Sequence, residues 1–442
     1  MRRLVPALLV LACAAPEPAV DESRSGGDTT VDDATINAFA LSARNMSFDR
    51  RQRFSVGNSF FNKNWVTAPA STATRDGLGP TFNARSCSTC HFKDGRGRPP
   101  APGEEFQGIL LRLGDAGVYG DQLQPHAIAD VPGEGTPRVT YVEQPGAFAD
   151  GEPYSLRVPT YTIDAPAFGD LPDEFTISPR VAPAMIGMGL LAAIPEADIL
   201  AAADPDDADG DGVSGRPNMV HDVANDTVKL GRLGWKANQP SVRQQVAGAF
   251  VGDMGITSSL FPDQNCPEGQ PACAAAIAGG EPEVSDHILD DVVLYSATLA
   301  VPARRGMDDP AVQRGKDVFH TAGCVACHTP MHVTGPDPEF PEVADQTIFP
   351  YTDLLLHDMG DELADHRPDF AADGNEWRTP PLWGLGLIET VNRHQDLLHD
   401  GRARGPLEAV LWHGGEATAA RDAVLALPKA DRDALIAFLD SL

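Results

Sequence analysis

Basic residues are scarce in this chain: 34 lysines and arginines stand against 63 aspartates and glutamates in 442 residues, which gives a net charge of −29. A protein that binds nucleic acid needs a basic surface, so nucleic acid is not expected as a partner. The simplest interpretation of the charge is a solvated, soluble surface. The alternative is a surface that attracts a basic redox partner protein. The length suits two or three domains, and a hydrophobic content of 42% is enough to form their cores.

Long apolar runs are also absent. The apolar run near the N-terminus, Leu4–Ala12, is too short to span a bilayer, and it follows the basic residues Arg2 and Arg3. This pattern is typical of an export signal. The segment Val10–Cys13 resembles a bacterial lipobox, in which the cysteine is lipidated. The sequence therefore predicts lipidation at Cys13, with ordinary secretion as the alternative.

The segment that follows this signal is rich in Pro, Ser, Gly and Asp. With the export signal at residues 1–13, this composition predicts a flexible tether at residues 14–34. No later segment is long and apolar enough to cross a membrane. We therefore expect a periplasmic protein that contacts the membrane only through a lipid anchor.

Cysteine is rare, and four of the seven cysteines belong to two Cys-x-x-Cys-His runs. These runs are Cys87-Ser88-Thr89-Cys90-His91 and Cys324-Val325-Ala326-Cys327-His328. Each run offers two thiols for thioether bonds to haem vinyl groups and a histidine as the proximal iron ligand. Zinc binding is the alternative, but it needs more ligands nearby and does not account for a histidine after both pairs. We therefore expect two covalently bound c-type haems as cofactors.

The two cysteines that remain, Cys266 and Cys273, lie close together in the sequence. In an oxidising compartment such a pair is expected to close a small disulfide loop. A disulfide, an export signal and covalent haem all agree with a location outside the cytoplasm.

Helical patterns surround the second haem motif. Ala311–His320 places Val312 and Phe319 on one side, and Asp431–Leu442 carries an apolar stripe with i, i+3, i+4, i+7 spacing. Residues 306–442 are therefore expected to form one helical haem domain.

The first motif follows a helix-like run at Arg50–Phe61 and precedes segments with a different pattern. Apolar and polar residues alternate in Tyr154–Val158, and Ile109–Leu113 and Val139–Val142 are also strand-like. Helical character returns at Ala182–Leu191 and Val242–Phe250.

Together these patterns predict a mainly α protein with two cytochrome c-like haem domains. The first domain would comprise residues 35–305 and carry a β-rich insertion at about residues 105–175. The second would comprise residues 306–442.

Three segments carry a resemblance to a known family. Gly77–Cys87, Tyr351–Gly360 and Trp412–Ala417 resemble the bacterial di-haem oxidoreductase family, which is often labelled thiol oxidoreductase-like and is distantly similar to the di-haem cytochrome c peroxidases. The resemblance covers roughly residues 40–442. It implies an oxidoreductase, and the peroxidases suggest peroxide or dioxygen as its substrate.

The same resemblance implies a second haem with two histidine ligands. Thr379–Leu382 and Leu398–Gly401 are similar to peroxidase motifs, and in those enzymes a distal Met lies fourteen residues after the His of the second motif. Fourteen residues after His399 stands His413. The pair His328 and His413 would give a lower potential than a His/Met pair.

Other interpretations of the second haem stay open. His413 could be a buried structural histidine. Met359 and His357 are rival candidates for the distal ligand of the second iron.

For the first haem, the resemblance implies a polar distal side. Trp235 matches a tryptophan that lies between the haems, Gln245 follows it by ten residues, and Asp253 stands near the place of a catalytic Glu. A carboxylate and an amide beside peroxide could move its proton and assist O–O cleavage. The alternatives are a polar helix face for Gln245, a turn for Asp253 and core packing for Trp235.

A non-catalytic electron carrier is the main alternative function, because a carrier has two six-coordinate haems. Such a carrier would need a further ligand for the first iron, and His126, Met185 and Met188 are candidates. Thiol oxidation rests on the family label only, since no pair of free cysteines is left to exchange with a dithiol.

An acidic run lies between the two haem motifs. Asp207, Asp209 and Asp211 occupy positions 1, 3 and 5 of a calcium-loop pattern, and Val213 could offer its carbonyl at position 7. The usual Glu at position 12 is replaced by Asn218. We expect one Ca²⁺ as a further cofactor, with an ordinary acidic turn as the alternative.

Overall fold

The computed structural model of the protein describes residues 21–442. The predicted export signal, lipidation at Cys13 and the first part of the predicted tether, residues 14–20, lie outside the described residues. Within residues 21–442, no helix combines the length and the apolar character needed to span a bilayer.

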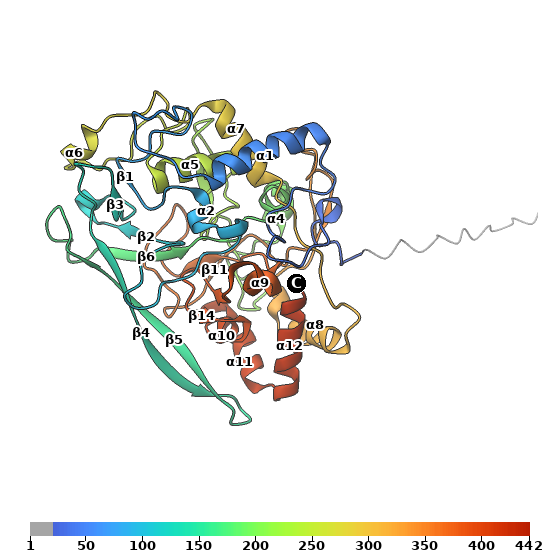
Figure 1. Cartoon of the computed structure of the whole chain (residues 1–442). Helices are drawn as coiled ribbons and strands as arrows, with labels where there is room; N and C mark the ends of the chain where they lie inside the picture. The colour runs from blue at the N-terminus through green and yellow to red at the C-terminus, as the bar shows by residue number, and fades with distance from the viewer. Residues whose placement is uncertain (1–20) are drawn as a thin grey trace, which may run out of the picture.

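The described residues form short helices separated by strands and long irregular segments (Figure 1). The helices are α1 (Phe48–Asn62), α2 (Cys87–Cys90), α3 (Met188–Ala192), α4 (Glu196–Ala201), α5 (Val242–Met254), α6 (Pro271–Ala274), α7 (Asp286–Ala297), α8 (Pro310–Thr321), α9 (Ile388–Asn392), α10 (Pro406–Leu411), α11 (Thr418–Ala426) and α12 (Lys429–Ser441). The strands are β1 (Thr81–Phe82), β2 (Ile109–Gly114), β3 (His126–Ala127), β4 (Thr136–Ala147), β5 (Pro153–Asp164), β6 (Thr176–Val181), β7 (Met219–Asp222), β8 (Thr227–Leu230), β9 (His332–Val333), β10 (Thr347–Ile348), β11 (Leu356–Asp358), β12 (Glu376–Arg378), β13 (Asp396–Leu397) and β14 (Ala403–Arg404).

The prediction of a mainly α protein with two cytochrome c-like domains is wrong. Only 29% of the chain is helical and 18% is strand. Every sheet in the described residues is an antiparallel pair of strands. The segment between the second haem motif and α10, expected to be helical, instead carries β9 to β14 and only the five-residue helix α9. Its strands have two or three residues each, so they are held by long-range pairing rather than by a local pattern.

Each haem motif lies beside a pair of crossing helices. α1 packs on α7 near α2, and α8 packs on α12 near the 3₁₀ turn Cys324–Ala326. Both crossings need a glycine. A Cβ on Gly57 would lie 2.0 Å from the Asp291 carbonyl oxygen, and a Cβ on Gly315 would lie 1.9 Å from that of Ala434. The helices expected at Arg50–Phe61, Ala311–His320 and Asp431–Leu442 are thus confirmed, with slightly different ends.

The predicted strands after the first motif are also present. β2 pairs with β6, so Leu110 lies opposite Arg180, and β4 pairs with β5 over twelve residues. The β4–β5 hairpin extends away from the rest of the molecule (Figure 1). At its inner side Arg157 bonds to Asp396 at 2.6 Å, so the hairpin is attached to the C-terminal part of the chain.

The described part of the predicted tether, residues 21–34, is not flexible but packed. Thr29 and Thr30 are buried, and the Glu22 carboxylate contacts Arg304 at 2.7 Å and Lys316 at 2.6 Å. Val31 forms a β-bridge with Pro302. Composition alone predicted flexibility because it ignores these long-range ion pairs.

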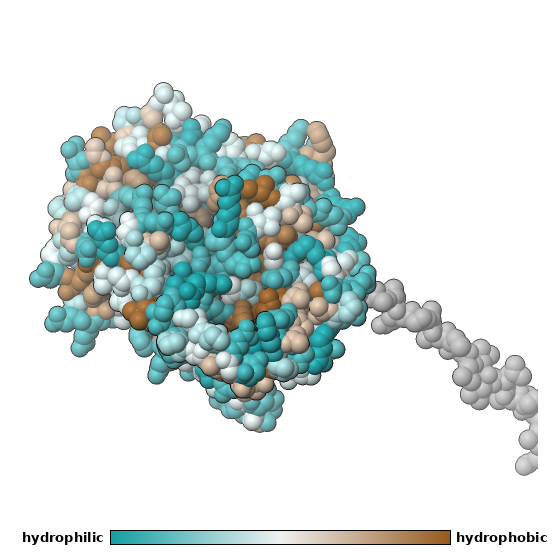
Figure 2. Space-filling view, turned by 60° about the horizontal axis from the view of Figure 1, so that its bottom comes forward, coloured by the Kyte–Doolittle hydropathy of each residue, from teal (hydrophilic) through white to brown (hydrophobic). Residues whose placement is uncertain are grey.

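One large apolar core runs through the molecule. It contains Phe39 and Leu294 from the first predicted domain together with Trp383 and Trp412 from the second. A smaller cluster around Phe438 joins α8 to α12. The division of the chain at residue 305 stays a prediction. The face shown in Figure 2 is mostly hydrophilic, with small scattered apolar patches, as expected for a chain with a large excess of acidic residues.

Candidate functional site

A single cavity of about 1030 Å³ connects the two Cys-x-x-Cys-His motifs. Its lining includes both cysteines and the histidine of each run, namely Cys87, Cys90, His91, Cys324, Cys327 and His328. Small-molecule sites usually measure about 300–1,000 Å³, so this cavity is at or above the upper end of that range. Two motifs that are 237 residues apart in the sequence, from Cys87 to Cys324, therefore share one interior space.

The four motif cysteines are unpaired thiols. Burial, together with the nearby Asp253 carboxylate, raises the pKa of Cys87 and Cys90 to about 12. Within residues 21–442, the first motif belongs to no cluster of three or more metal-binding side chains. At the first motif, the zinc interpretation therefore lacks the additional ligands that it requires. At the second motif, Cys327 lies in a cluster with Asp353 and His357, whose ligand atoms are within 4.8 Å of one another.

The motif histidines are oriented in the same way. His91 Nδ1 donates to the Pro183 carbonyl at 2.9 Å, and His328 Nδ1 donates to the Tyr351 carbonyl at 2.9 Å. This contact fixes the tautomer that leaves Nε2 with a lone pair, as iron-binding histidines require. Burial lowers the pKa of both imidazoles to about 4, so both are neutral. The donor sets of both motifs thus fit haem.

His413 lies two residues after the end of α10 and lines the same cavity as His328. Its Nδ1 donates to the Ala409 carbonyl at 2.7 Å, which again leaves Nε2 free. His413 also contributes to the lowered pKa of His328, so the two imidazoles lie near each other. The structure therefore brings together the pair expected to ligate the second iron. Ligation itself stays a prediction.

The rival candidate His357 is held by carboxylates. Its Nε2 contacts Asp353 at 2.9 Å, and its Nδ1 contacts Glu416 at 2.8 Å. Burial alone would lower the pKa of His357, but hydrogen bonds to Asp353, Cys327 and Glu416 outweigh it and raise the pKa to about 12. A charged imidazole with both nitrogens bonded has no lone pair for a metal. Met359, the other rival, does line the cavity.

The residues expected on the distal side of the first haem also reach this cavity. Gln245 and Asp253 both lie on α5 and both belong to the lining. Asp253 accepts a hydrogen bond from Gln122 at 2.9 Å, and burial raises the pKa of its carboxyl group. Because the Asp253 charge affects the pKa of Cys87 and Cys90, this carboxylate lies close to the first motif.

Trp235 lines the cavity beside other aromatic side chains. Its Nε1 donates to the Val181 carbonyl at 2.8 Å, and the Arg96 guanidinium lies 5.0 Å from its ring centroid. It packs with Trp377 in a small apolar cluster. The structure is thus compatible both with core packing and with a place between two cofactors.

The three candidates for a further ligand of the first iron differ in whether they line the cavity. His126 pairs with Phe82 in the β1–β3 ladder and is not part of the cavity lining. Met185 and Met188 are buried and do line the cavity.

The sequence did not identify Trp377 and assigned no role to His399. These rings stack with centroids 3.8 Å apart and planes 8° apart, and both line the cavity. The only sequence signal was their position: Trp377 lies two residues before Thr379–Leu382, and His399 lies in the His-Asp-Gly motif.

The acidic run has a different geometry from the expected calcium loop. The carboxylates of Asp204, Asp207 and Asp209 have oxygens within 4.8 Å of one another, whereas the Asp211 carboxylate accepts a hydrogen bond from the Val213 amide at 2.8 Å. Asn218, at position 12, donates to the Lys236 and Asp369 carbonyls (2.7 and 3.0 Å). Asp204 was therefore missed, and position 12 contributes nothing to the loop.

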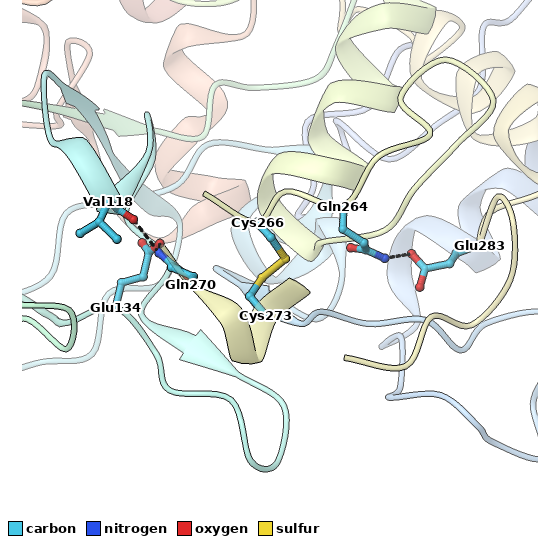
Figure 3. The surroundings of a disulfide bond; sticks show 7 residues. All are labelled: Val118, Glu134, Gln264, Cys266, Gln270, Cys273 and Glu283. Atoms are coloured by element: carbon cyan, nitrogen blue, oxygen red, sulfur yellow. Dashed lines mark hydrogen bonds between the residues drawn. A yellow bond between two sulfur atoms is a disulfide. The ribbon is translucent and has the colours of Figure 1, made fainter. Parts of the chain in front are cut away.

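Cys266 and Cys273 are joined by a disulfide, with sulfurs 2.00 Å apart. Figure 3 shows this bond between two amide–carboxylate contacts. Gln270 donates to Glu134 at 2.7 Å on one side, and Gln264 donates to Glu283 at 2.9 Å on the other. The disulfide loop is thus attached to two separate parts of the chain.

Comparison with known proteins agrees with this site. No curated protein and no solved structure matches the chain. A family model described as "Di-haem oxidoreductase, putative peroxidase" matches residues 19–124 and 100–442, which is nearly the whole chain. Both Cys-x-x-Cys-His motifs and the cavity that joins them lie within these matches. The chain therefore belongs to the di-haem oxidoreductase family.

Proposed function

We propose that this protein is an exported c-type di-haem oxidoreductase that reduces peroxide, or reacts with dioxygen, at its first haem. The observation that carries the proposal is the single cavity lined by both motifs, with His91 and His328 held in the neutral, Nε2-free form. Bound haem supplies an iron that exchanges electrons and, where one axial position is open, binds a small oxidant. Cys87 and Cys90 would attach the first haem, and Cys324 and Cys327 the second.

The two haems would have different roles. His413 and His328 would together ligate the iron of the second haem, which would then serve to store electrons. Trp235, which lines the cavity, would help to pass electrons between the two haems. Two such centres can supply both electrons of the reaction H₂O₂ + 2H⁺ + 2e⁻ → 2H₂O.

Gln245 and Asp253 would serve the first haem. Burial raises the pKa of Asp253, which favours the protonated form that can donate a proton to peroxide. The Gln245 amide would bind the oxidant and orient it. Gln122, which bonds to the Asp253 carboxylate, would hold that group in place.

The location follows from the sequence. We propose a periplasmic protein that is anchored through a lipid on Cys13 and receives electrons from a redox partner protein or a small electron donor. The Cys266–Cys273 disulfide is compatible with an oxidising compartment. Calcium bound at Asp207 and its neighbours would be a further, structural cofactor.

A second candidate function, electron transfer without catalysis, is favoured by one observation. Met185 and Met188 are buried and line the cavity, so a thioether is available as a further ligand. If one of them ligates the first iron, both haems are six-coordinate and the protein is a carrier.

Steady-state reduction of hydrogen peroxide by the reduced holoprotein distinguishes the two candidates. We expect turnover by the wild type and a loss of about 10²–10⁴-fold in kcat/KM for Asp253→Asn, the usual range for general acid–base catalysis. Gln245→Leu should also lose activity. Gln244→Leu is the matched control, because Gln244 is its neighbour on α5 but bonds to the Val223 amide and does not line the cavity. No turnover by wild-type protein that carries both haems would favour the carrier.

A further inference from the structure

Two arginines in the cavity lining are buried without a carboxylate partner. Of the five arginines that the structure places in this lining, Arg112, Arg180 and Arg421 form ion pairs with Asp residues. Arg96 and Arg378 form none, although they are only 8% and 7% exposed. A buried cation without a counter-ion is costly to desolvate, so some anion is expected to approach it.

Both side chains are held by main-chain carbonyls alone. Arg96 Nε donates to Asp396 O at 2.8 Å and Nη2 to Leu398 O, while Arg378 Nε donates to Gly234 O at 2.8 Å and Nη1 to Thr379 O at 3.0 Å. Among the described residues, Arg96 Nη1 and Arg378 Nη2 are left without a hydrogen-bond acceptor. Burial lowers the pKa of both guanidinium groups to about 10, so both remain charged near neutral pH.

The nearest carboxylates are already bound by other cations. Around Arg96 they are Asp396 and Asp400, which pair with Arg157 at 2.6 Å and Arg402 at 2.9 Å. Near Arg378 the nearest is Asp353, which contacts His357 at 2.9 Å. The missing anion must therefore come from whatever occupies the cavity.

Both arginines contact Trp235 or its main-chain neighbour. The Arg96 guanidinium lies 5.0 Å from the centroid of its ring, and the Arg378 amide donates to the Trp235 carbonyl at 2.9 Å. Arg96 follows the first motif by five residues. Arg378 lies opposite Leu356 in the β11–β12 ladder, and the Asp353 carboxylate that acts on its pKa has an oxygen within 4.8 Å of Cys327 Sγ of the second motif.

We propose that Arg96 binds a propionate carboxylate of the first haem and Arg378 a propionate carboxylate of the second. This assignment rests on the proposed function, since it requires haem at both motifs. Haem is the cofactor named by the family, and each haem carries two carboxylates and no other anionic group. A guanidinium with free N–H groups is the side chain best suited to hold a carboxylate.

Resonance Raman spectra of the holoprotein test this assignment, because the propionate bending bands respond to hydrogen bonding. We expect Arg96→Lys to shift the band of one haem and Arg378→Lys that of the other, because a single ammonium cannot reproduce the guanidinium fork. Arg96→Gln and Arg378→Gln should also make the midpoint potential of the affected haem more negative and dependent on pH. The lysine variants keep the charge, so they remain informative if the glutamine variants fail to fold.

Arg112→Lys is the matched control, since Arg112 lines the cavity but is already paired with Asp121. Unchanged propionate bands in both Arg96→Lys and Arg378→Lys would overturn the assignment, and so would an equal shift in Arg112→Lys. Haem content is measured on the same samples. Wild-type protein with fewer than two haems per chain would refute the proposed function instead, so the two failures are distinguishable.

Discussion

Trp377 and His399 stack face to face, with ring centroids 3.8 Å apart and planes inclined by only 8°. The pair joins β12 to the segment that follows β13 and forms part of the wall of the shared cavity. The Lys236 ammonium lies 4.6 Å from the Trp377 ring centroid, and the Trp377 Nε1 donates to the Leu363 carbonyl at 2.9 Å. Trp377 is therefore fixed by three different kinds of contact.

Removal of Trp377 is expected to destabilise the protein strongly. Trp377→Ala should lower the free energy of unfolding by about 3–5 kcal/mol, because it removes a large buried ring and leaves a cavity. His399→Phe should cost less than about 1.5 kcal/mol, since a second aromatic ring preserves the stack. Urea unfolding monitored by circular dichroism measures both values. Equal losses in the two variants would show that the stack is not held mainly by Trp377.

Replacement of His357 should also destabilise the protein, but for an electrostatic reason. His357→Leu would leave Asp353 and Glu416 without their cation, which is expected to cost about 3–5 kcal/mol for a buried charge pair. His320→Leu, at an exposed position of α8, is the control and should change stability by less than about 0.5 kcal/mol.

The same histidine should affect stability at alkaline pH. The pKa of His357 is raised to about 12 in the folded protein, above the value near 6.5 of an unfolded chain. Its stabilising contribution is therefore complete below about pH 6.5 and is lost progressively as the pH rises toward 12. Unfolding at pH 6, 8 and 10 should show a decline in wild type that is smaller in His357→Leu. Parallel curves would contradict a charged His357.

Glu134 is expected to make the stability of the protein depend on pH in the acidic range. Its side chain is fully buried, and burial raises its pKa to about 7, although hydrogen bonds from Gln270 and the Gln124 amide oppose this shift. A folded-state pKa above the unfolded value makes the contribution of Glu134 most favourable below about pH 4.5, and this stability is lost as the pH rises to 7.

Glu134→Gln should remove that dependence while it keeps a similar shape. Because only the wild type has a charge to desolvate, we expect the stability of the variant relative to wild type to increase by about 1–3 kcal/mol as the pH rises from 4.5 to 7. Thermal unfolding across this range measures the difference. Exposed Glu105 provides the control, and a Glu105→Gln variant should follow wild type. A constant difference at every pH would mean that Glu134 does not titrate here.

Calcium binding at the acidic run is a separate prediction. We expect added Ca²⁺ to raise the melting temperature of metal-free holoprotein, and we expect the double variant Asp207→Asn, Asp209→Asn to abolish this increase. Asp226→Asn, which removes a highly exposed carboxylate elsewhere, should leave it intact. If Ca²⁺ stabilises the double variant as strongly as wild type, the acidic run is an ordinary turn.

The sequence predicted the helices and strands that leave a pattern in their own residues. Helical periodicity identified α1, α5, α8 and α12, and alternation identified β2, β4 and β5. Ala182–Leu191 was a partial success, since the helix begins only at Met188, after Gly187 in the left-handed conformation. The fold class was wrong because β9 to β14 are too short to leave a pattern and exist only through their long-range partners.

The site residues show the same division between those with a local sequence pattern and those defined by long-range contacts. Both haem-motif histidines were recognisable from spacing and His413 from the resemblance to the di-haem peroxidases, and the structure places all three in the lining of one cavity. Arg96, Arg378 and Trp377 could not be recognised from the sequence. The two arginines are distinguished by burial without a counter-ion, and Trp377 is distinguished by a contact with a residue distant in the sequence. A single arginine carries no sequence signal that it will be buried.

The coordination of the two irons tests the central claim most directly. We would record low-temperature electron paramagnetic resonance spectra of the ferric holoprotein and then absorption spectra after reduction and addition of carbon monoxide. The account predicts one high-spin and one low-spin haem, with carbon monoxide bound to one haem only and the low-spin signal lost in His413→Ala. Two low-spin haems that do not bind carbon monoxide when reduced would contradict an open catalytic iron and would identify the protein as an electron carrier.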